Sequence, residues 1–288
     1  MKVLLTGARG QLGTDVIKEL DIRNHVSVGT DIEIMDITVE ASVSSVIKSI
    51  NPDAVIHCAA WTAVDAAEEP ENRAKVFAVN VDGTRNIAEV CKEIDCKMMY
   101  ISTDYVFNGQ GTEPWKADSD DYAPLNVYGE SKLQGELAVK ETLDKYFIVR
   151  TGWVFGKNGN NFVKTMLTIG KKYDKIKVVN DQIGTPTYTP DLARLLVDMI
   201  ETDKYGVYHA TNEGGYISWY DFACEIFKQA GYDTIVIPVT TEEYGVSKAK
   251  RPLNSRLNKD KLSRNGFINL PDWKCSLCKY FNDNCEEG

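Results

Sequence analysis

The sequence predicts an α/β fold in which a doubly wound parallel sheet is joined to a smaller, irregular α+β domain. Across the first half of the 288 residues, short apolar runs alternate with longer segments of helical periodicity. Central apolar runs of this kind are typical of parallel strands that helices cover on both faces. After about residue 152 the alternation becomes irregular, and aromatic residues, Gly and Asn become frequent. This change of rhythm predicts the second domain.

The first two strand–helix pairs follow from local patterns. Residues 2–6 (KVLLT) are a run of strand formers, and residues 11–20 repeat Leu, Val and Ile at helical spacing. Residues 25–30 (HVSVGT) predict a second strand. Residues 41–50 carry Val and Ile on one face, which predicts the second helix.

The next units are separated by a clear break. The Asn-Pro-Asp sequence at residues 51–53 ends the second helix, and residues 54–57 (AVIH) predict a third strand. Residues 70–93 form a long helical stretch. A fourth strand follows at residues 97–102 (KMMYIS), then a helix at 126–143 and a fifth strand at 146–151 (YFIVRT).

The second half predicts fewer regular elements. Helices are expected at residues 162–173, 190–201 and 219–230, with a strand at 175–180. We expect a first domain over residues 1–155, to which about 178–203 returns. The smaller α+β domain then covers mainly residues 156–288.

Composition excludes several classes of protein. Lys and Arg total 33 against 42 Asp and Glu, a formal net charge of -9, which argues against a nucleic-acid or anionic-membrane binder. It does not exclude small phosphates, because backbone amides and a few local cations can hold them. No run approaches a membrane span, and the first residues leave no room for a signal peptide, so a cytoplasmic location is expected.

Metal and disulfide chemistry have little support in the sequence. Seven cysteines in a chain of this kind predict reduced thiols, and the three histidines are far apart. Cys275, Cys278 and Cys285 could bind Zn²⁺ with one more ligand, but no histidine lies nearby. A terminal helix that carries thiols is the expected structure, and the role of these three residues stays open.

A glycine turn follows the first strand and opens the first helix. Gly7, Gly10 and Gly13 allow a tight turn and let a pyrophosphate approach the backbone and the positive end of the helix. This pattern predicts a Rossmann-like nucleotide site. Asp31, at the end of the second strand, suits an adenosine ribose and disfavours a 2′-phosphate. Arg9 has the opposite preference, since guanidinium pairs with phosphate. Together they favour NADH over NADPH.

A Tyr–Lys pair predicts acid–base chemistry. Tyr128 and Lys132 are four residues apart on a helix and therefore share a face. An ammonium about 4 Å away can stabilise phenolate by up to about 4 kcal/mol, which would lower the tyrosine pKa. Thr103 ends the fourth strand, where open α/β sheets bind ligands, and its hydroxyl could hold a substrate oxygen.

Several segments together resemble the extended short-chain dehydrogenase/reductase family, from the first strand to about Leu262. They are TGARGQLG (6–13), HCAAWTAVDAAE (57–68), STDYVFNG (102–109), PLNVYGESKLQGE (124–136), RTGWVFG (150–156), NDQIGTPTYTPDLA (180–193) and RPLNSRL (251–257). The resemblance implies an NAD(P)H-dependent enzyme that reduces the C4 ketone of the dTDP-linked 6-deoxyhexose dTDP-4-dehydro-β-L-rhamnose, giving dTDP-L-rhamnose. The second domain would bind this substrate.

The resemblance also assigns residue roles. Tyr128 would be the general acid, Lys132 would hold the nicotinamide ribose and lower the Tyr128 pKa, and Thr103 would bind the keto oxygen. The implied cofactor contacts are Gly7, Arg9, Gly10, Gln11, Leu12, Gly13, Asp31, Asp36, Ile37, Ala59, Ala60, Trp61, Thr62, Tyr128 and Lys132. The implied substrate contacts are Thr103, Asp104, Trp153 and Arg251.

Other readings stay open. Nucleotide-sugar 4,6-dehydratases carry Asp-Glu after the threonine, whereas Asp104 is followed here by Tyr105, which favours simple reduction. A reductase of another nucleotide-linked keto sugar is an alternative, as is a non-catalytic nucleotide-binding subunit like the regulatory subunit of methionine adenosyltransferase. Some family members are described as holding Mg²⁺ through glutamates at a dimer interface. Asp15 and Thr189-Pro190 stand there instead, so Mg²⁺ and the homodimer are open.

Overall fold

The computed structural model describes residues 1–285, with side chains up to Asp283. Its larger lobe is a sheet of six parallel strands in the order β10-β5-β4-β3-β1-β2. The strands span Lys2–Thr6 (β1), Val26–Thr30 (β2), Ala54–His57 (β3), Lys97–Thr103 (β4), Tyr146–Thr151 (β5) and Gly206–His209 (β10). From β1, the chain builds outward in both directions, which confirms the doubly wound sheet.

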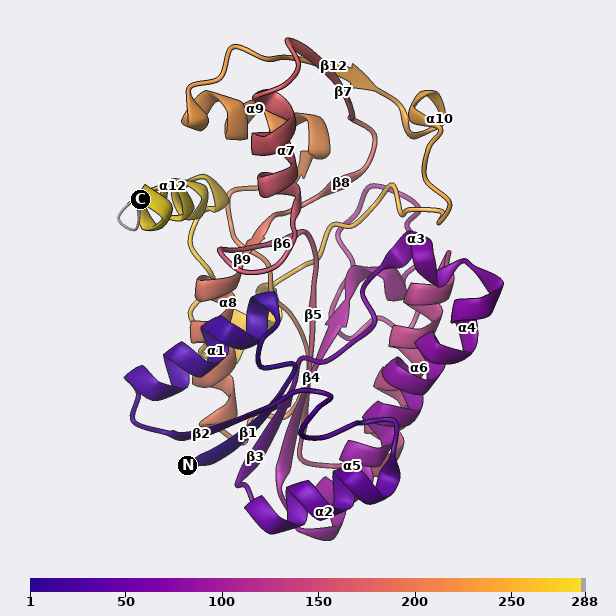
Figure 1. Cartoon of the computed structure of the whole chain (residues 1–288), viewed down its shortest axis with the longest axis vertical. Helices are drawn as coiled ribbons and strands as arrows, with labels where there is room; N and C mark the ends of the chain where they lie inside the picture. The colour runs from indigo at the N-terminus through magenta and orange to yellow at the C-terminus, as the bar shows by residue number, and fades with distance from the viewer. Residues whose placement is uncertain (286–288) are drawn as a thin grey trace.

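Helices cover both faces of this sheet (Figure 1). One face carries Gln11–Ile22 (α1) and Thr189–Ile200 (α8), and the other carries Glu40–Ile50 (α2), Gly83–Glu93 (α5) and Val127–Thr142 (α6). Successive strand residues point to opposite faces. Val3 and Leu5 therefore pack in the α1–α8 layer, while Leu4 packs against α2 and α5. Each face has its own fully buried apolar core.

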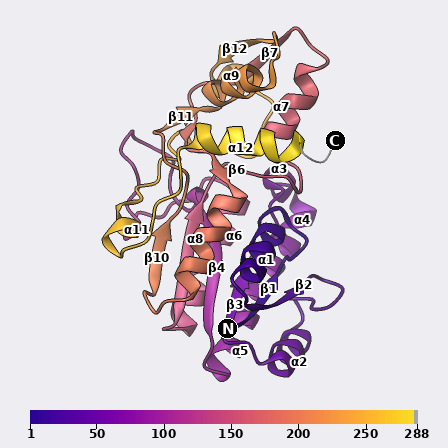
Figure 2. The ribbon, with the colours of Figure 1, turned by 90° about the vertical axis from the view of Figure 1, so that its left-hand side faces the viewer.

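The smaller lobe lies beyond the carboxyl ends of the strands (Figure 1). Its core packs Phe155, Phe222, Trp273 and other aromatic side chains. Its elements are Val154–Phe155 (β6), Phe162–Gly170 (α7), Lys175–Val179 (β7), Ile183–Gly184 (β8), Thr187–Tyr188 (β9), Ile217–Ser218 (β11), Trp219–Ala230 (α9), Ile235–Val239 (β12), Thr241–Tyr244 (α10) and Trp273–Cys285 (α12). Figure 2 shows α12 lying between the two lobes.

The return of the chain to the main sheet differs in detail from the expected range of 178–203. Helix α8 does pack on α1, but β7 pairs with β12 in the smaller lobe. The strand that joins the main sheet is β10, which follows that range and pairs in parallel with β5. Short strands of three or four apolar residues carry too little pattern to show which sheet they join.

The long helical stretch at residues 70–93 is three elements. Pro70–Phe77 (α4) continues into a π-helical turn at Ala78–Asp82 (η1) and then into α5. Short helices also occur at Val64–Ala67 (α3), Asp104–Val106 (η2) and Asp260–Arg264 (α11). Within residues 1–285, none of the helices is both long enough and apolar enough to cross a membrane.

Candidate active site

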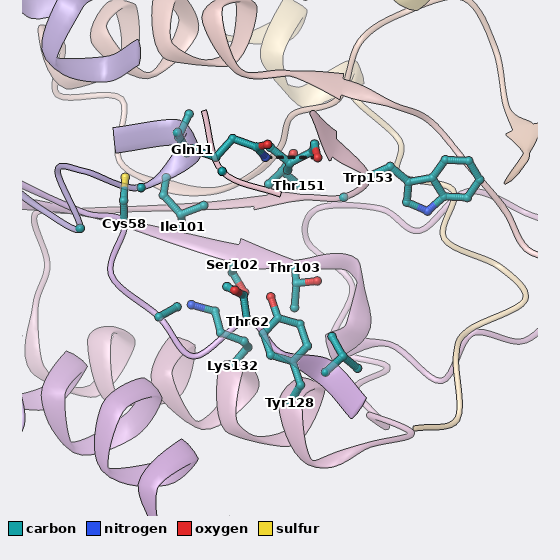
Figure 3. A pocket seen from close by; sticks show the side chains of 18 of the residues that line it. Gln11, Cys58, Thr62, Ile101, Ser102, Thr103, Tyr128, Lys132, Thr151 and Trp153 are labelled. Atoms are coloured by element: carbon teal, nitrogen blue, oxygen red, sulfur yellow. Dashed lines mark hydrogen bonds between the residues drawn. The ribbon is translucent and has the colours of Figure 1, made fainter. Parts of the chain in front are cut away.

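A cavity of about 740 Å³ opens where the carboxyl ends of β1, β3, β4 and β5 face the smaller lobe (Figure 3). Parallel strands end at one edge of a sheet, so residues far apart in sequence meet there. The glycine turn lies at one end of the cavity and the Tyr–Lys pair at the other. Predicted site residues that line it are Gly7, Gly10, Gln11, Leu12, Gly13, Asp31, Ala59, Ala60, Thr62, Thr103, Asp104, Tyr128, Lys132 and Trp153.

The glycine turn has the geometry that a diphosphate requires. Gly7 has φ of +65°, and a Cβ there would lie 2.8 Å from the backbone nitrogen of Ala59. A Cβ on Gly13 would lie 2.1 Å from the carbonyl oxygen of Gly7. Helix α1 begins after Gly10 with no side-chain cap, which leaves its first N–H groups free for an anion. The chain here therefore fits a dinucleotide.

Asp31, which follows β2, lies beside Arg9 of the glycine turn. The Asp31 carboxylate accepts hydrogen bonds from the Arg9 backbone nitrogen at 3.1 Å and from Arg9 Nε at 3.0 Å. Arg9 also pairs with Glu33, and these two carboxylates raise the pKa of its guanidinium. Asp31 lines the cavity, whereas Arg9 does not. Its side chain is 69% exposed.

Three other predicted cofactor residues lie outside the cavity lining. Asp36 accepts hydrogen bonds from the backbone nitrogen and hydroxyl of Thr38 at 2.9 and 2.7 Å. Ile37 is buried against Gly83. The backbone nitrogen of Trp61 donates to Asn80 at 2.8 Å. None of these three residues lines the cavity.

Helix α6 carries both members of the predicted Tyr–Lys pair. Its N-cap, Asn126, accepts a hydrogen bond from the Gly129 nitrogen at 2.8 Å. Figure 3 shows Tyr128 and Lys132 pointing from this helix toward the ends of the strands, where Tyr128 faces Thr103. The predicted face-sharing pair and the threonine hydroxyl are therefore brought together.

The pKa values of this pair differ from the expectation that Lys132 lowers the tyrosine pKa. Burial raises the pKa of Tyr128 to about 12, although a hydrogen bond with Thr103 acts in the opposite direction. Burial lowers the pKa of Lys132 to about 7, against the attraction of Glu136. The Lys132 ammonium lies 3.9 Å from the centre of the Tyr100 ring. Burial has the largest effect on the Tyr128 pKa, so the phenol holds its proton at neutral pH.

Asp104 is a buried carboxyl on the cavity wall. Its Oδ1 accepts a hydrogen bond from the Thr103 hydroxyl at 3.0 Å. Its Oδ2 has no hydrogen-bond partner among the residues described. Burial raises the pKa of Asp104 to about 6, with hydrogen bonds from Ser255 and Thr103 opposing the shift. One carboxyl oxygen is thus buried without a hydrogen-bond partner among the described residues.

Of the two remaining predicted substrate residues, one lines the cavity and the other does not. Trp153 lines the cavity with a backbone φ of +52° and stacks on Trp219, with ring centres 3.6 Å apart. Arg251 is absent from the cavity lining and instead pairs with both oxygens of Asp65, at 3.0 and 2.8 Å. The structure therefore does not place Arg251 where the resemblance puts it, because an acidic partner on α3 holds its guanidinium.

Sequence reasoning missed several residues of the cavity wall. Trp219 and Phe162 come from the smaller lobe, and no motif marks them. Cys58 stood only within a matching segment, and Tyr105 was used only as evidence against a dehydratase, yet both line the cavity. Tyr105 directly follows the Thr103–Asp104 pair, and this proximity was the available signal.

The possible metal positions show other contacts. The Thr189 hydroxyl donates to Asp15 at 2.5 Å, which joins α8 to α1. Cys275 and Cys278 are exposed on α12, and the Cys285 side chain lies outside the described part. Among the described residues, no three His, Cys, Asp or Glu side chains gather as metal ligands would.

The fold and the site define a class. A doubly wound sheet, a glycine turn before its first helix and a Tyr-x-x-x-Lys pair beside a strand-end threonine together characterise a short-chain dehydrogenase/reductase. The chain belongs to the family described as the RmlD substrate binding domain, whose model matches residues 1–285.

Named proteins agree with this assignment. The chain is 40% identical to a dTDP-4-dehydrorhamnose reductase of Aggregatibacter actinomycetemcomitans, covering 96% of this chain and 97% of that one. It is 38% identical to a spore coat polysaccharide biosynthesis protein of Bacillus subtilis, covering 98% and 97%. A crystal structure of dTDP-4-dehydrorhamnose reductase from Bacillus anthracis, in complex with NADP, superposes with a TM-score of 0.93 at 44% identity, covering 98% and 100%.

Proposed function

We propose that the protein reduces the C4 ketone of dTDP-4-dehydro-β-L-rhamnose to dTDP-L-rhamnose with NADPH or NADH. The observation that carries the proposal is the single cavity with a glycine turn at one end and Tyr128, Lys132 and Thr103 at the other. The relatives named dTDP-4-dehydrorhamnose reductase, at about 40% identity over nearly their whole length, support the substrate.

The side chains at the strand ends suit carbonyl reduction. The bound nicotinamide supplies the hydride. The Thr103 hydroxyl holds the keto oxygen, and Tyr128 gives that oxygen a proton as the alkoxide forms. A phenol with a pKa near 12 stays protonated at neutral pH, which is the state that a proton donor needs. Lys132 supplies positive charge beside it.

The neighbours of Thr103 support reduction over water elimination. Asp104 and Tyr105 follow it, and both line the cavity. Tyr105 is a phenol whose pKa burial raises further, so it cannot act as the carboxylate base of a dehydratase. The intact proton-donor site also argues against a purely regulatory nucleotide-binding role.

The cofactor site suits both nicotinamide dinucleotides. Asp31 faces the cavity and can accept hydrogen bonds from a ribose. Arg9 lies beside it and is largely exposed, so its guanidinium can turn toward a 2′-phosphate. NADP in the related Bacillus anthracis structure supports NADPH as a cofactor, where the sequence alone favoured NADH.

In this proposal the two lobes bind different ligands. Residues 1–155, with α8 and β10, bind the cofactor, and the rest of the chain mainly closes over the sugar nucleotide. Trp153 and Asp104 contact the sugar in this arrangement, while the aromatic wall around Trp219 limits its size. The cytoplasmic location and the homodimer stay predictions.

The test is oxidation of NADPH and NADH by the purified protein with dTDP-4-dehydrorhamnose. The expected result is substrate-dependent loss of the reduced cofactor and formation of dTDP-L-rhamnose. A second dTDP-linked 4-keto-6-deoxyhexose serves as the specificity control. No turnover with either cofactor would refute the proposed activity, and faster turnover of the control sugar would reassign the substrate.

A further inference from the structure

A short strap, residues 248–251, crosses α3 and the start of α6. The backbone nitrogen of Ala249 donates to Asp65 Oδ1 at 3.0 Å. Arg251 adds two hydrogen bonds to the same carboxylate, at 3.0 and 2.8 Å. Lys248 pairs with Glu69. Contacts from three of its four residues thus fasten the strap to α3 and to Glu69, the residue that precedes α4.

The strap and α3 also hold the first turn of α6, which carries Tyr128. Asn126, the N-cap of α6, donates its amide to the carbonyl of Lys250 at 2.9 Å. Glu68, at the end of α3, accepts a hydrogen bond from the backbone nitrogen of Val127 at 2.7 Å. Hydrogen bonds therefore connect the strap, α3 and the start of α6. Tyr128 directly follows Val127, the last residue in these hydrogen bonds.

Arg251 lies near Tyr105, which lines the cavity. The hydrogen bond to Asp65 raises the pKa of the Arg251 guanidinium against the effect of burial, and the neighbouring Tyr105 raises it further. The Tyr105 ring packs edge-on against Tyr128, with ring centres 5.7 Å apart and planes at 77°. Tyr105 lines the cavity, whereas Arg251 does not. Arg251 thus pairs with Asp65 on one side and has Tyr105, whose ring packs on Tyr128, as a neighbour on the other.

We propose that Arg251 is a positioning residue that orients Tyr128 through Tyr105, and that Asp65 holds Arg251 in place for this purpose. The inference rests on the proposed function, in which Tyr128 donates the proton. A planar guanidinium held by two carboxylate oxygens is rigid, and an edge-on aromatic contact transmits that rigidity to the donor ring. The hydrogen bond from Arg251 also lowers the pKa of Asp65, so this pair persists at neutral pH.

The competing role for Arg251 is direct binding of the substrate diphosphate. The two roles predict opposite effects of Asp65→Asn. If Arg251 binds phosphate, removing the competing carboxylate charge frees the guanidinium, and the affinity for dTDP rises. If Arg251 is a positioning residue, Asp65→Asn and Arg251→Lys both slow the chemical step and lower kcat to a similar extent.

The experiment measures kcat, KM and the Kd of dTDP for Asp65→Asn, Arg251→Lys and Tyr105→Phe. Glu69→Gln is the matched control, since it removes an exposed strap pair that does not contact Tyr105. The expected result is a loss of kcat of about tenfold or more in the three variants, with KM and Kd within about twofold of wild type, because small misplacement of a reacting group slows the chemical step. Glu69→Gln should match wild type.

A second readout does not depend on turnover. With ¹³C-labelled tyrosine, the ring signal that disappears in Tyr128→Phe belongs to Tyr128. The chemical shift of this signal should change in Asp65→Asn and Arg251→Lys, and it should be unchanged in Glu69→Gln. Tyr105→Phe removes only one hydroxyl, so it keeps the test valid if a charge variant folds poorly.

A raised KM and Kd in Arg251→Lys with unchanged kcat, or a lowered Kd in Asp65→Asn, would overturn the proposal. So would an unmoved Tyr128 signal. If the Tyr128 signal moves in the variants as expected but the folded wild-type protein shows no turnover, the proposed function is refuted instead.

Discussion

Asp104 gives the prediction whose size follows most directly from the structure. The carboxyl is buried on the cavity wall, and one of its oxygens lacks a hydrogen-bond partner among the described residues. Burial raises its pKa from 3.8 to about 6. The unfolded chain therefore releases this proton near pH 4, while the folded protein keeps it until about pH 6.

This difference makes the folded state less stable as pH rises. Because the folded pKa is the higher one, the folded state binds more protons between about pH 4 and 6, and the free energy of unfolding falls across that window. The shift from 3.8 to about 6 is roughly two units. At about 1.4 kcal/mol per unit, the cost is on the order of 3 kcal/mol above pH 6 and absent below pH 4.

Asp104→Asn keeps the shape of the side chain and removes the charge. The variant should exceed wild type in free energy of unfolding by up to about 3 kcal/mol at pH 8, with the gain nearly absent at pH 4. Urea unfolding at pH 4, 6 and 8 measures it. Asp82→Asn, at a carboxylate whose side chain is 60% exposed, is the control. A variant no more stable than wild type at pH 8, or a gain equal at all three pH values, would refute the reasoning.

Three further predictions concern the cofactor site and the pair on α6. Gly13→Ala should abolish NADPH binding, measured by cofactor fluorescence, since the new Cβ would lie 2.1 Å from a carbonyl oxygen of the turn. The kcat should fall as pH rises through about 7, where Lys132 loses its proton, while Tyr128 keeps its own to about pH 12. A pH–rate profile that stays flat from pH 6 to 9 would contradict this. Arg9→Ala should raise KM for NADPH about tenfold or more and leave KM for NADH nearly unchanged.

Local patterns were sufficient to predict most of the larger lobe. The five predicted strands match β1 to β5 within a residue or so, because buried parallel strands read as continuous apolar runs. The glycine turn and the Tyr–Lys pair were also visible, since each depends on spacing within one turn or helix. Because parallel strands end at the same edge of the sheet, the position of Thr103 near this pair could also be predicted.

What the sequence could not show depends on tertiary contacts. Strand β10 has only four residues, and its pairing with β5 joins segments that are far apart in the sequence. The partner of Arg251 lies 186 residues earlier in the chain. The Tyr128 pKa also depends on burial, which a Tyr-x-x-x-Lys spacing does not reveal. These are the points at which the structure changed the predicted site.

The most direct test of the central claim compares wild type with Tyr128→Phe in NADPH binding and in single-turnover reduction of dTDP-4-dehydrorhamnose. We predict that the variant binds NADPH with the wild-type Kd and loses ~10²–10⁴-fold in the rate of reduction, the usual contribution of a general acid. A variant that reduces the sugar at the wild-type rate would show that Tyr128 is not the proton donor.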